Sequence, residues 1–176
     1  SKGTGDMALA YADISTGEVV VSATNPNRLA ADLATIGPSE LLLNEGFFEG
    51  QGLFDILQES KSALTPLAAS RFESSAAEHR LKSHYKVETL DAFGDFRRID
   101  IAALGALIEY ISITQVGNIP YLREPRIEAP EAGLLIDAST RANLELTRSQ
   151  SGERKGSLLA CMTETVTAGG TRLLAD

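Results

Sequence analysis

The sequence predicts an α/β fold in which helices pack on a mixed β-sheet. Three features of the first third of the chain carry this prediction: two strand-like segments joined by a tight turn, an amphipathic segment with helix start and stop signals, and a further short apolar run. Strand, strand, helix and strand in this order is typical of a mixed sheet with helices on its faces.

Residues 8–24 are predicted to form a β-hairpin. Leu9 and Tyr11 alternate with small alanines, and Val19-Val20-Val21 is a β-branched run, which is the composition that strands favour. Between the two segments, Gly17 can take the positive φ that a tight turn requires.

A helix and a third strand follow the hairpin. Asn25-Pro26 is a start signal, since proline fits the first turn of a helix, and Gly37-Pro38 is a stop signal. Three apolar residues recur between them at helical spacing: Leu29, Leu33 and Ile36. The run Leu41–Leu43, bounded by turn residues, predicts a buried strand.

The middle of the chain predicts three more helices. The first lies near residues 51–59, while residues 60–70 show no firm period. The second is a polar helix from Glu73 to Lys86; its inward residues are Ala76, Ala77, Leu81 and Tyr85, and its mostly outward residues are Glu78, His79, Arg80 and Lys82. The third, over residues 99–116, is apolar on most sides, with Asp100 near its start and Glu109 as its only interior charge. Such a helix is normally buried in the centre of a domain.

The C-terminal part predicts a second body. Residues 117–130 are proline-rich and are expected to cross a surface between two bodies, so we divide the chain at 1–130 and 131–176. Asp137 is placed to cap a helix from Ser139 to about Arg148. A polar loop follows over 149–156, and Leu158, Leu159 and Met162 open another helix.

Composition excludes several classes of protein. The first 59 residues carry nine acidic side chains against Lys2 and Arg28, so this third of the chain would be repelled by a phosphate backbone. No stretch approaches the roughly 20 apolar residues of a membrane span, so no membrane contact is expected. Cys161 is the single cysteine, which excludes a disulfide framework and a cysteine-rich zinc site and fits a reducing compartment.

Catalytic motifs are weak. His79 and His84 are five residues apart, a poor pairing on one helix face, and no Gly-x-Ser-x-Gly or phosphate loop occurs. A hairpin with Asp13 in its first strand resembles the RNase H fold, whose nucleases hold two metal ions with several acids. Other acids occur at Glu45, Asp55 and Asp100, but no spacing forces them together. We expect Asp13 to stabilise its turn, and a metal-dependent nuclease stays the alternative.

Five segments in order carry a family resemblance. Pro38-Ser39-Glu40-Leu41-Leu42 fits P-x-E-[IL]-L, and residues 137–146 fit D-x-x-T-R-x-N-L-E-[IL]. Residues 9–18, 110–120 (Y-x-x-x-T-Q, then Ile-Pro) and 157–174 continue the pattern. Together they resemble the connector domain and the start of the core domain of bacterial DNA mismatch repair proteins of the MutS family.

This resemblance implies a role without catalysis in this chain. The family's connector is RNase H-like without nuclease activity, links the mismatch-reading domain to the core, helps transmit nucleotide state and offers a docking surface for the repair protein MutL. The family's ATP and Mg²⁺ site lies far C-terminal to this segment, so no cofactor is expected here, and DNA contact is expected only through the longer parent protein, in the cytoplasm.

The resemblance also implies where MutL docks and where this chain departs from the family. We expect the docking surface on the polar helix, through Glu78, His79, Arg80 and Lys82. Lys86 stands where many relatives have glycine, which affects the turn after this helix. The apolar strand that opens the family's connector is not expected before Leu9, and the core helices stop at Asp176. The strand edges and apolar helix faces that these segments would cover predict non-native self-association of the segment.

Overall fold

The computed structural model describes residues 7–46, 57, 63–115, 120–128, 140, 143–146, 148–165 and 170. The chain divides into two compact units, Ser1–Gly133 and Leu134–Asp176. The first unit is a mixed α/β structure, which confirms the predicted class. None of the helices in the described ranges is long and apolar enough to cross a membrane.

The first sheet is built on the predicted hairpin. Strands β1 (Met7–Asp13) and β2 (Glu18–Thr24) pair antiparallel, with Met7 opposite Thr24 and Asp13 opposite Glu18. At the turn, Gly17 takes φ 76°, as expected. Its carbonyl accepts a hydrogen bond from the Arg123 amide at 2.7 Å, which joins the hairpin tip to the segment that leads into the third strand.

The third strand was not anticipated. Strand β5 (Arg126–Glu128) pairs parallel to β2 and completes the order β1-β2-β5. The Tyr11 hydroxyl donates to the Glu128 carboxylate at 3.0 Å, and Arg126 pairs with Glu18 at 2.8 Å. Part of the segment expected to cross a surface between two bodies is therefore a sheet strand. Three residues are too few to show a period in the sequence.

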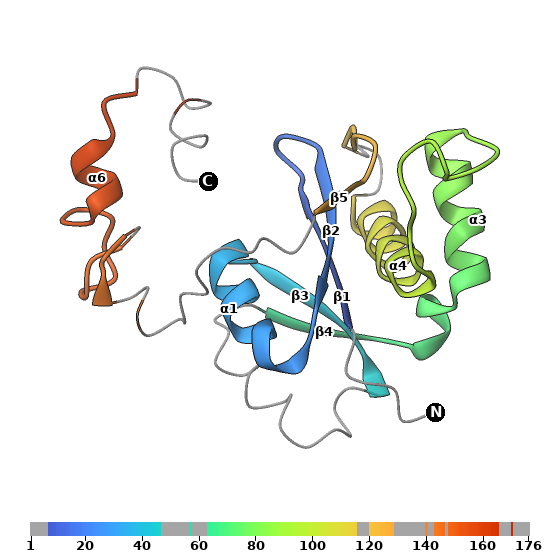
Figure 1. Ribbon diagram of the computed structural model, residues 1–176, viewed down its shortest axis with the longest axis horizontal. Coiled ribbons are helices and arrows are strands. Elements are labelled where there is room, and N and C mark those ends of the chain that lie inside the picture. The colour runs from blue at the N-terminus through green and yellow to red at the C-terminus, as the bar shows by residue number, and fades with distance from the viewer. Residues whose placement is uncertain are drawn as a thin grey trace. The chain divides into compact units, whose positions relative to one another are not determined.

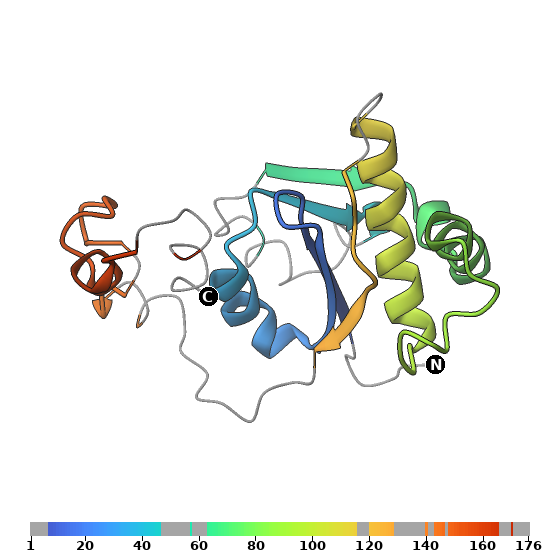
Figure 2. The same ribbon diagram turned by 90° about the horizontal axis from the view of Figure 1, so that it is seen from above.

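Helices cover both faces of this sheet (Figures 1 and 2). Helix α1 (Pro26–Ile36) lies on one side, and the long helix α4 (Arg98–Thr114) lies on the other, with α3 (Ser74–Tyr85) packed outside α4. The small side chains Ala8, Ala10 and Ala12 face the α4 side, where the larger of the two core clusters lies; its buried members are Val19, Val21, Leu81, Leu90, Leu104, Ile108, Ile111 and Leu122. The prediction that the 99–116 helix is central is confirmed.

Strand β3 (Glu40–Asn44) pairs parallel with β4 (Ala63–Leu67) in a second sheet, so within the described residues it does not join the hairpin. The single sheet expected from the sequence is therefore two sheets in the described residues. Strand β4 was not predicted, because Pro66 donates no ladder hydrogen bond and argues against a strand in the sequence. Leu41 is buried with Leu29 and Leu33 of α1. A short 3₁₀ turn, η2 (Ala69–Phe72), leads into α3. The helix predicted near 51–59 lies outside the described residues except for Leu57, which is helical and buried.

The second unit contains α6 (Leu158–Met162), as predicted, preceded by an exposed polar loop. The helix expected from Ser139 to about Arg148 does not extend that far, because residues 144–146 form a turn and Glu145 takes φ 49°. The Glu145 carbonyl accepts the Leu158 amide at 2.9 Å, so it bonds the start of α6 and not a further helical turn. Asp137, the predicted cap, lies outside the described residues.

Candidate protein-docking site

Helix α3 is capped at both ends. The Glu73 carboxylate accepts hydrogen bonds from the Ser75 hydroxyl and from the amides of Ser75 (3.2 Å) and Ala76 (3.0 Å), which lowers the pKa of Glu73. At the other end Lys86 takes φ 56°, and its amide donates to the Lys82 carbonyl. Lys86 therefore adopts the left-handed turn that glycine favours, at a cost of about 1 kcal/mol.

The inner face of α3 is fixed against α4. Ala77 and Leu81 are fully buried, as predicted, while Ala76 and Tyr85 are only half-buried. Gly105 of α4 lies directly against Ala77, because a Cβ built on Gly105 would come within 2.7 Å of the Ala77 Cα. This close approach holds α3 in one position relative to α4.

The four residues predicted for the outer face do not all point outward. His79 is exposed. Arg80 instead turns toward α4, where its guanidinium lies 3.4 Å from the Glu109 carboxylate and donates a 2.6 Å hydrogen bond to the Arg71 carbonyl. Glu109 is the one interior charge of an apolar helix, and a partly buried charge requires partners. The expectation that Arg80 presents a free charge is therefore corrected.

Glu78 and Lys82 form an ion pair on the other side of α3. The Lys82 ammonium lies 2.6 Å from the Glu78 carboxylate, one helical turn apart, and both side chains are half-buried. A pair at this level of exposure contributes less than about 1 kcal/mol to stability. The positive charge of Lys82 is thus matched within the helix.

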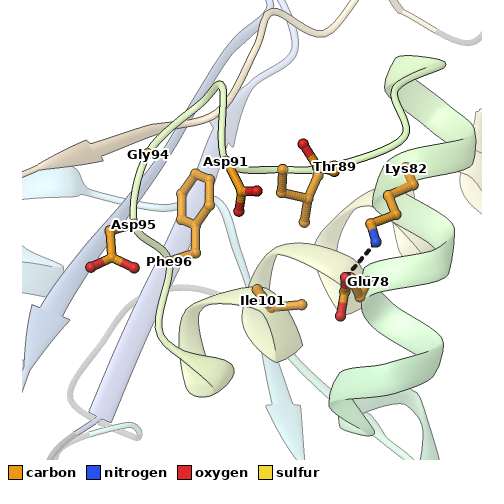
Figure 3. Close-up of a pocket in the computed structure, with 9 residues that line it drawn as sticks. Glu78, Lys82, Thr89, Asp91, Gly94, Asp95, Phe96 and Ile101 are labelled. Carbon is orange, nitrogen blue, oxygen red and sulfur yellow. Dashed lines mark ion pairs between the residues drawn. The ribbon is translucent and has the colours of Figure 1, made fainter.

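This ion pair forms one wall of a pocket of about 200 Å³ (Figure 3). The segment that links α3 to α4 forms the opposite wall, where Asp91 and Phe96 lie across from Glu78 and Lys82. Ile101, in the first turns of α4, lies between the two walls. The exposed lining of the pocket is therefore more polar than apolar, with charged side chains at its rim.

The rim is negative overall. The carboxylates of Asp91 and Asp95 form no ion pair within the described part of the chain, and both residues are exposed. Because Lys82 is already paired with Glu78, the four charged residues that line the pocket leave two uncompensated negative charges. Phosphate groups are repelled by such a rim, and basic side chains are attracted to it.

Neither histidine belongs to a group of three potential metal ligands among the described residues. Burial lowers the pKa of His84, and His79 lies exposed on the helix surface. Behind the pocket, the Tyr85 ring packs edge-on against Phe93 at 5.5 Å, and burial raises the pKa of Tyr85 to about 12. Both aromatic side chains belong to the core at the end of α3.

The acids considered for metal-dependent cleavage have separate structural partners. Asp13 accepts hydrogen bonds from the Ser15 amide (2.7 Å) and hydroxyl (2.6 Å), as the turn-stabilising interpretation predicts. Asp100 is buried in a capping box with Arg97, and Glu45 accepts from the Ala69 amide. Asp55 lies outside the described residues. In the described ranges no three acidic, histidine or cysteine side chains are placed to hold a metal ion, so the nuclease alternative has no support.

Comparison with known proteins places these features in a family. The family described as MutS domain II matches residues 1–123, which include α3 and the whole pocket. The chain belongs to the MutS family of DNA mismatch repair proteins. Similar relatives named DNA mismatch repair protein MutS occur in Ruegeria pomeroyi (51% identical, 95% of this chain), Dinoroseobacter shibae (49%, 97%) and Azorhizobium caulinodans (45%, 99%). The chain spans 19% of the length of each of these MutS proteins.

Sequence reasoning found α3 of this MutS-family chain but not the pocket beside it. Thr89, Asp91 and Phe96 lie in an irregular segment without a helical or strand period. Their convergence depends on how α3 packs on α4, and no local signal in the sequence reports that packing.

Proposed function

We propose that this chain is the connector of a MutS-type mismatch repair protein, RNase H-like in fold and without catalysis of its own. The main support is that the residues matched to MutS domain II include α3 together with the part of α4 against which its buried side chains pack. The separate structural roles of Asp13, Glu45 and Asp100 support a non-nuclease interpretation.

The connector links the other domains of the full-length protein and relays nucleotide state between them. ATP and Mg²⁺ act in a part of the parent protein outside this segment, and DNA is held through the parent. The central position of α4, packed between the sheet and α3, supports a rigid relay, because a displacement of either layer is transmitted through close-packed side chains.

Helix α3 is the docking surface for a MutL-type repair protein. Its exposed side offers His79 and the Glu78–Lys82 pair, while its inner side is immobilised by Ala77. A rigid, charged helix face suits reversible recognition, because little conformational freedom is lost when the partner binds.

The test uses the full-length protein bound to mismatched DNA. The variants His79→Glu and Lys82→Glu change the charge on the outer side of α3, the second also by breaking the Glu78–Lys82 ion pair, whereas Arg80 is left intact because its substitution would break the contact with Glu109. We expect MutL recruitment to weaken about threefold to tenfold, the range for exposed charged contacts, with mismatch binding unchanged.

Lys155→Glu serves as the matched control for Lys82→Glu, since it makes the same charge reversal in the exposed loop of the second unit. Recruitment by this variant should equal that of the unaltered protein. If the α3 variants also recruit MutL at the unaltered level, helix α3 is not the docking surface.

A further inference from the structure

We infer that Glu109 of α4 is a positioning residue for the docking helix: it sets the orientation of α3 through Arg80 and does not itself contact the partner. The inference deepens the docking function proposed above and rests on it. It assigns a role in docking to a side chain of the inner helix, behind the surface that MutL would meet.

The Glu109 carboxylate joins three elements at one point. Its Oε1 atom lies 2.8 Å from the guanidinium of Arg71 in η2, and its Oε2 atom lies 3.4 Å from the guanidinium of Arg80 in α3. A second guanidinium nitrogen of Arg80 donates a hydrogen bond to the Arg71 carbonyl at 2.6 Å. Arg80 is therefore held at two points, one on α4 and one on η2.

The Oε2 atom of Glu109 depends on Arg80. This oxygen is buried and accepts no hydrogen bond from any residue that the structure describes. Because a buried carboxylate oxygen without a donor is costly, the positive charge of Arg80 is what compensates it. The side chains of Arg80 and Glu109 are 24% and 25% exposed, so salt screens this contact less than it screens a fully exposed pair.

The ion pair adds a directional contact to a helix with few buried side chains. In α3, all of which the structure describes, two residues are buried, Ala77 and Leu81. Ala77 lies against Gly105, four residues before Glu109 on α4. Residues four apart share a helix face, so this contact and the ion pair are successive turns of one helix–helix interface. The small-residue contact sets the distance between the helices, and the ion pair one turn further restrains the rotation of α3 about that contact.

The same ion pair decides which charges α3 presents. The Arg80 charge is directed inward, while His79 next to it in the chain is exposed and Lys82 lies near the surface. Without the Glu109 carboxylate, the guanidinium groups of Arg71 and Arg80 would face each other with no anion between them and would repel. Arg80 would then turn to water, and the outer side of α3 would present a different arrangement of charge.

The experiment measures MutL recruitment by the full-length protein on mismatched DNA. Glu109→Gln removes the charge, and Glu109→Asp keeps it on a side chain that is one methylene shorter. The matched control is Glu18→Gln, which breaks an ion pair on the sheet, with Arg126, of the same 2.8 Å length as that between Arg71 and Glu109. Circular dichroism and mismatch binding verify that each variant is folded.

We expect Glu109→Gln to weaken recruitment about threefold to fivefold, Glu109→Asp to weaken it less because the charge is kept, and Glu18→Gln to stay within twofold of the unaltered protein. Phenylglyoxal, which modifies accessible guanidinium groups, should label Arg80 several-fold faster in Glu109→Gln, as read by mass spectrometry of the Arg80 peptide. The control should leave this labelling rate unchanged.

A second substitution tests whether Glu109 acts through Arg80. Arg80→Gln should weaken recruitment by about the same factor as Glu109→Gln. The double variant should recruit no worse than either single variant, because each substitution removes the same contact. Two side chains that contributed independently to the stability of the unit would instead give losses that multiply.

Three results would overturn the inference and leave the docking function standing, provided that the His79 and Lys82 variants weaken recruitment. In the first, Glu109→Gln recruits MutL as well as Glu18→Gln does. In the second, the labelling rate of Arg80 is the same in Glu109→Gln and in the unaltered protein. In the third, the losses of the two single variants multiply in the double variant. If neither the α3 variants nor Glu109→Gln changes recruitment, the docking function fails together with the inference.

Discussion

The contact between Gly105 and Ala77 makes a quantitative prediction about the anchor of α3. Replacing Gly105 with alanine places a methyl group within 2.7 Å of the Ala77 Cα and 3.2 Å of its carbonyl carbon. These are backbone atoms, so no side-chain rotation can relieve the clash, and α3 must move away from α4.

Two opposing effects set the size of the change. Alanine favours the interior of a helix over glycine by about 1 kcal/mol. Overpacking a close-packed core costs about 1–3 kcal/mol, and a clash with backbone belongs in the upper part of that range. Gly105→Ala should therefore lower the free energy of unfolding of the α3–α4 pair by about 1–2 kcal/mol.

The compensating variant isolates the contact. Ala77→Gly alone should also destabilise, because it weakens α3 and removes a buried methyl group worth about 0.8 kcal/mol. In the double variant Ala77→Gly/Gly105→Ala the contact with the Ala77 Cβ is removed, but the new methyl group still lies within 2.7 Å of the Cα of residue 77, so only part of the loss should be regained. The coupling free energy between the two sites should be about 1 kcal/mol.

Hydrogen exchange read by mass spectrometry over residues 74–85 and 98–114 measures these opening free energies helix by helix. This choice suits a chain of two compact units, whose global unfolding need not be two-state. If Gly105→Ala instead raised the opening free energy of these helices by about 1 kcal/mol, the change would equal the gain in helix propensity alone. That result would refute the close approach of the two helices.

Four further predictions follow from single sites. Asn25→Ala should lower the thermal stability by about 1 kcal/mol, because the Asn25 carboxamide oxygen accepts the amides of Asn27 (3.0 Å) and Arg28 (3.1 Å) at the start of α1, and Asn25→Asp should retain most of it. Lys86→Gly should raise stability to urea by up to about 1 kcal/mol by relieving the left-handed residue. Hydrogen bonds from Ser15 lower the pKa of Asp13 in the folded state. The stabilising contribution of Asp13 is therefore present above the unfolded pKa of about 3.9 and is lost as the pH falls through the lower folded pKa. Asp13→Asn should reduce the loss of stability that acid pH causes. Purified chain should neither cleave DNA with divalent metal nor hydrolyse ATP, and nicking that disappears in Asp13→Asn would contradict the proposed role.

Local signals in the sequence were sufficient for the hairpin and for helices α1, α3 and α4. The turn at Gly17, the cap at Asn25 and the stop at Gly37 are decided by residues within a few positions, and each lies where its chemistry predicts. The period of the 99–116 segment likewise identified the central helix, because an apolar surface on most sides leaves burial as its only stable environment.

Features that depend on distant partners could not be predicted. Strand β5 exists through its pairing with β2, and β4 through its pairing with β3 despite Pro66. The direction of Arg80 is decided by Glu109 on another helix. The pocket has the same origin, since its walls meet only after α3 packs on α4. Helix α3 was therefore predictable as an element, whereas the side chains it presents were not.

Hydroxyl-radical footprinting of the full-length protein on mismatched DNA, with and without MutL, tests the central claim most directly. The proposed docking surface predicts slower oxidation of His79 when MutL is bound, with Tyr121, an 82% exposed side chain elsewhere in the first unit, unchanged. Equal oxidation of His79 in both states, with protection at other side chains of this unit, would contradict the assignment of MutL docking to α3.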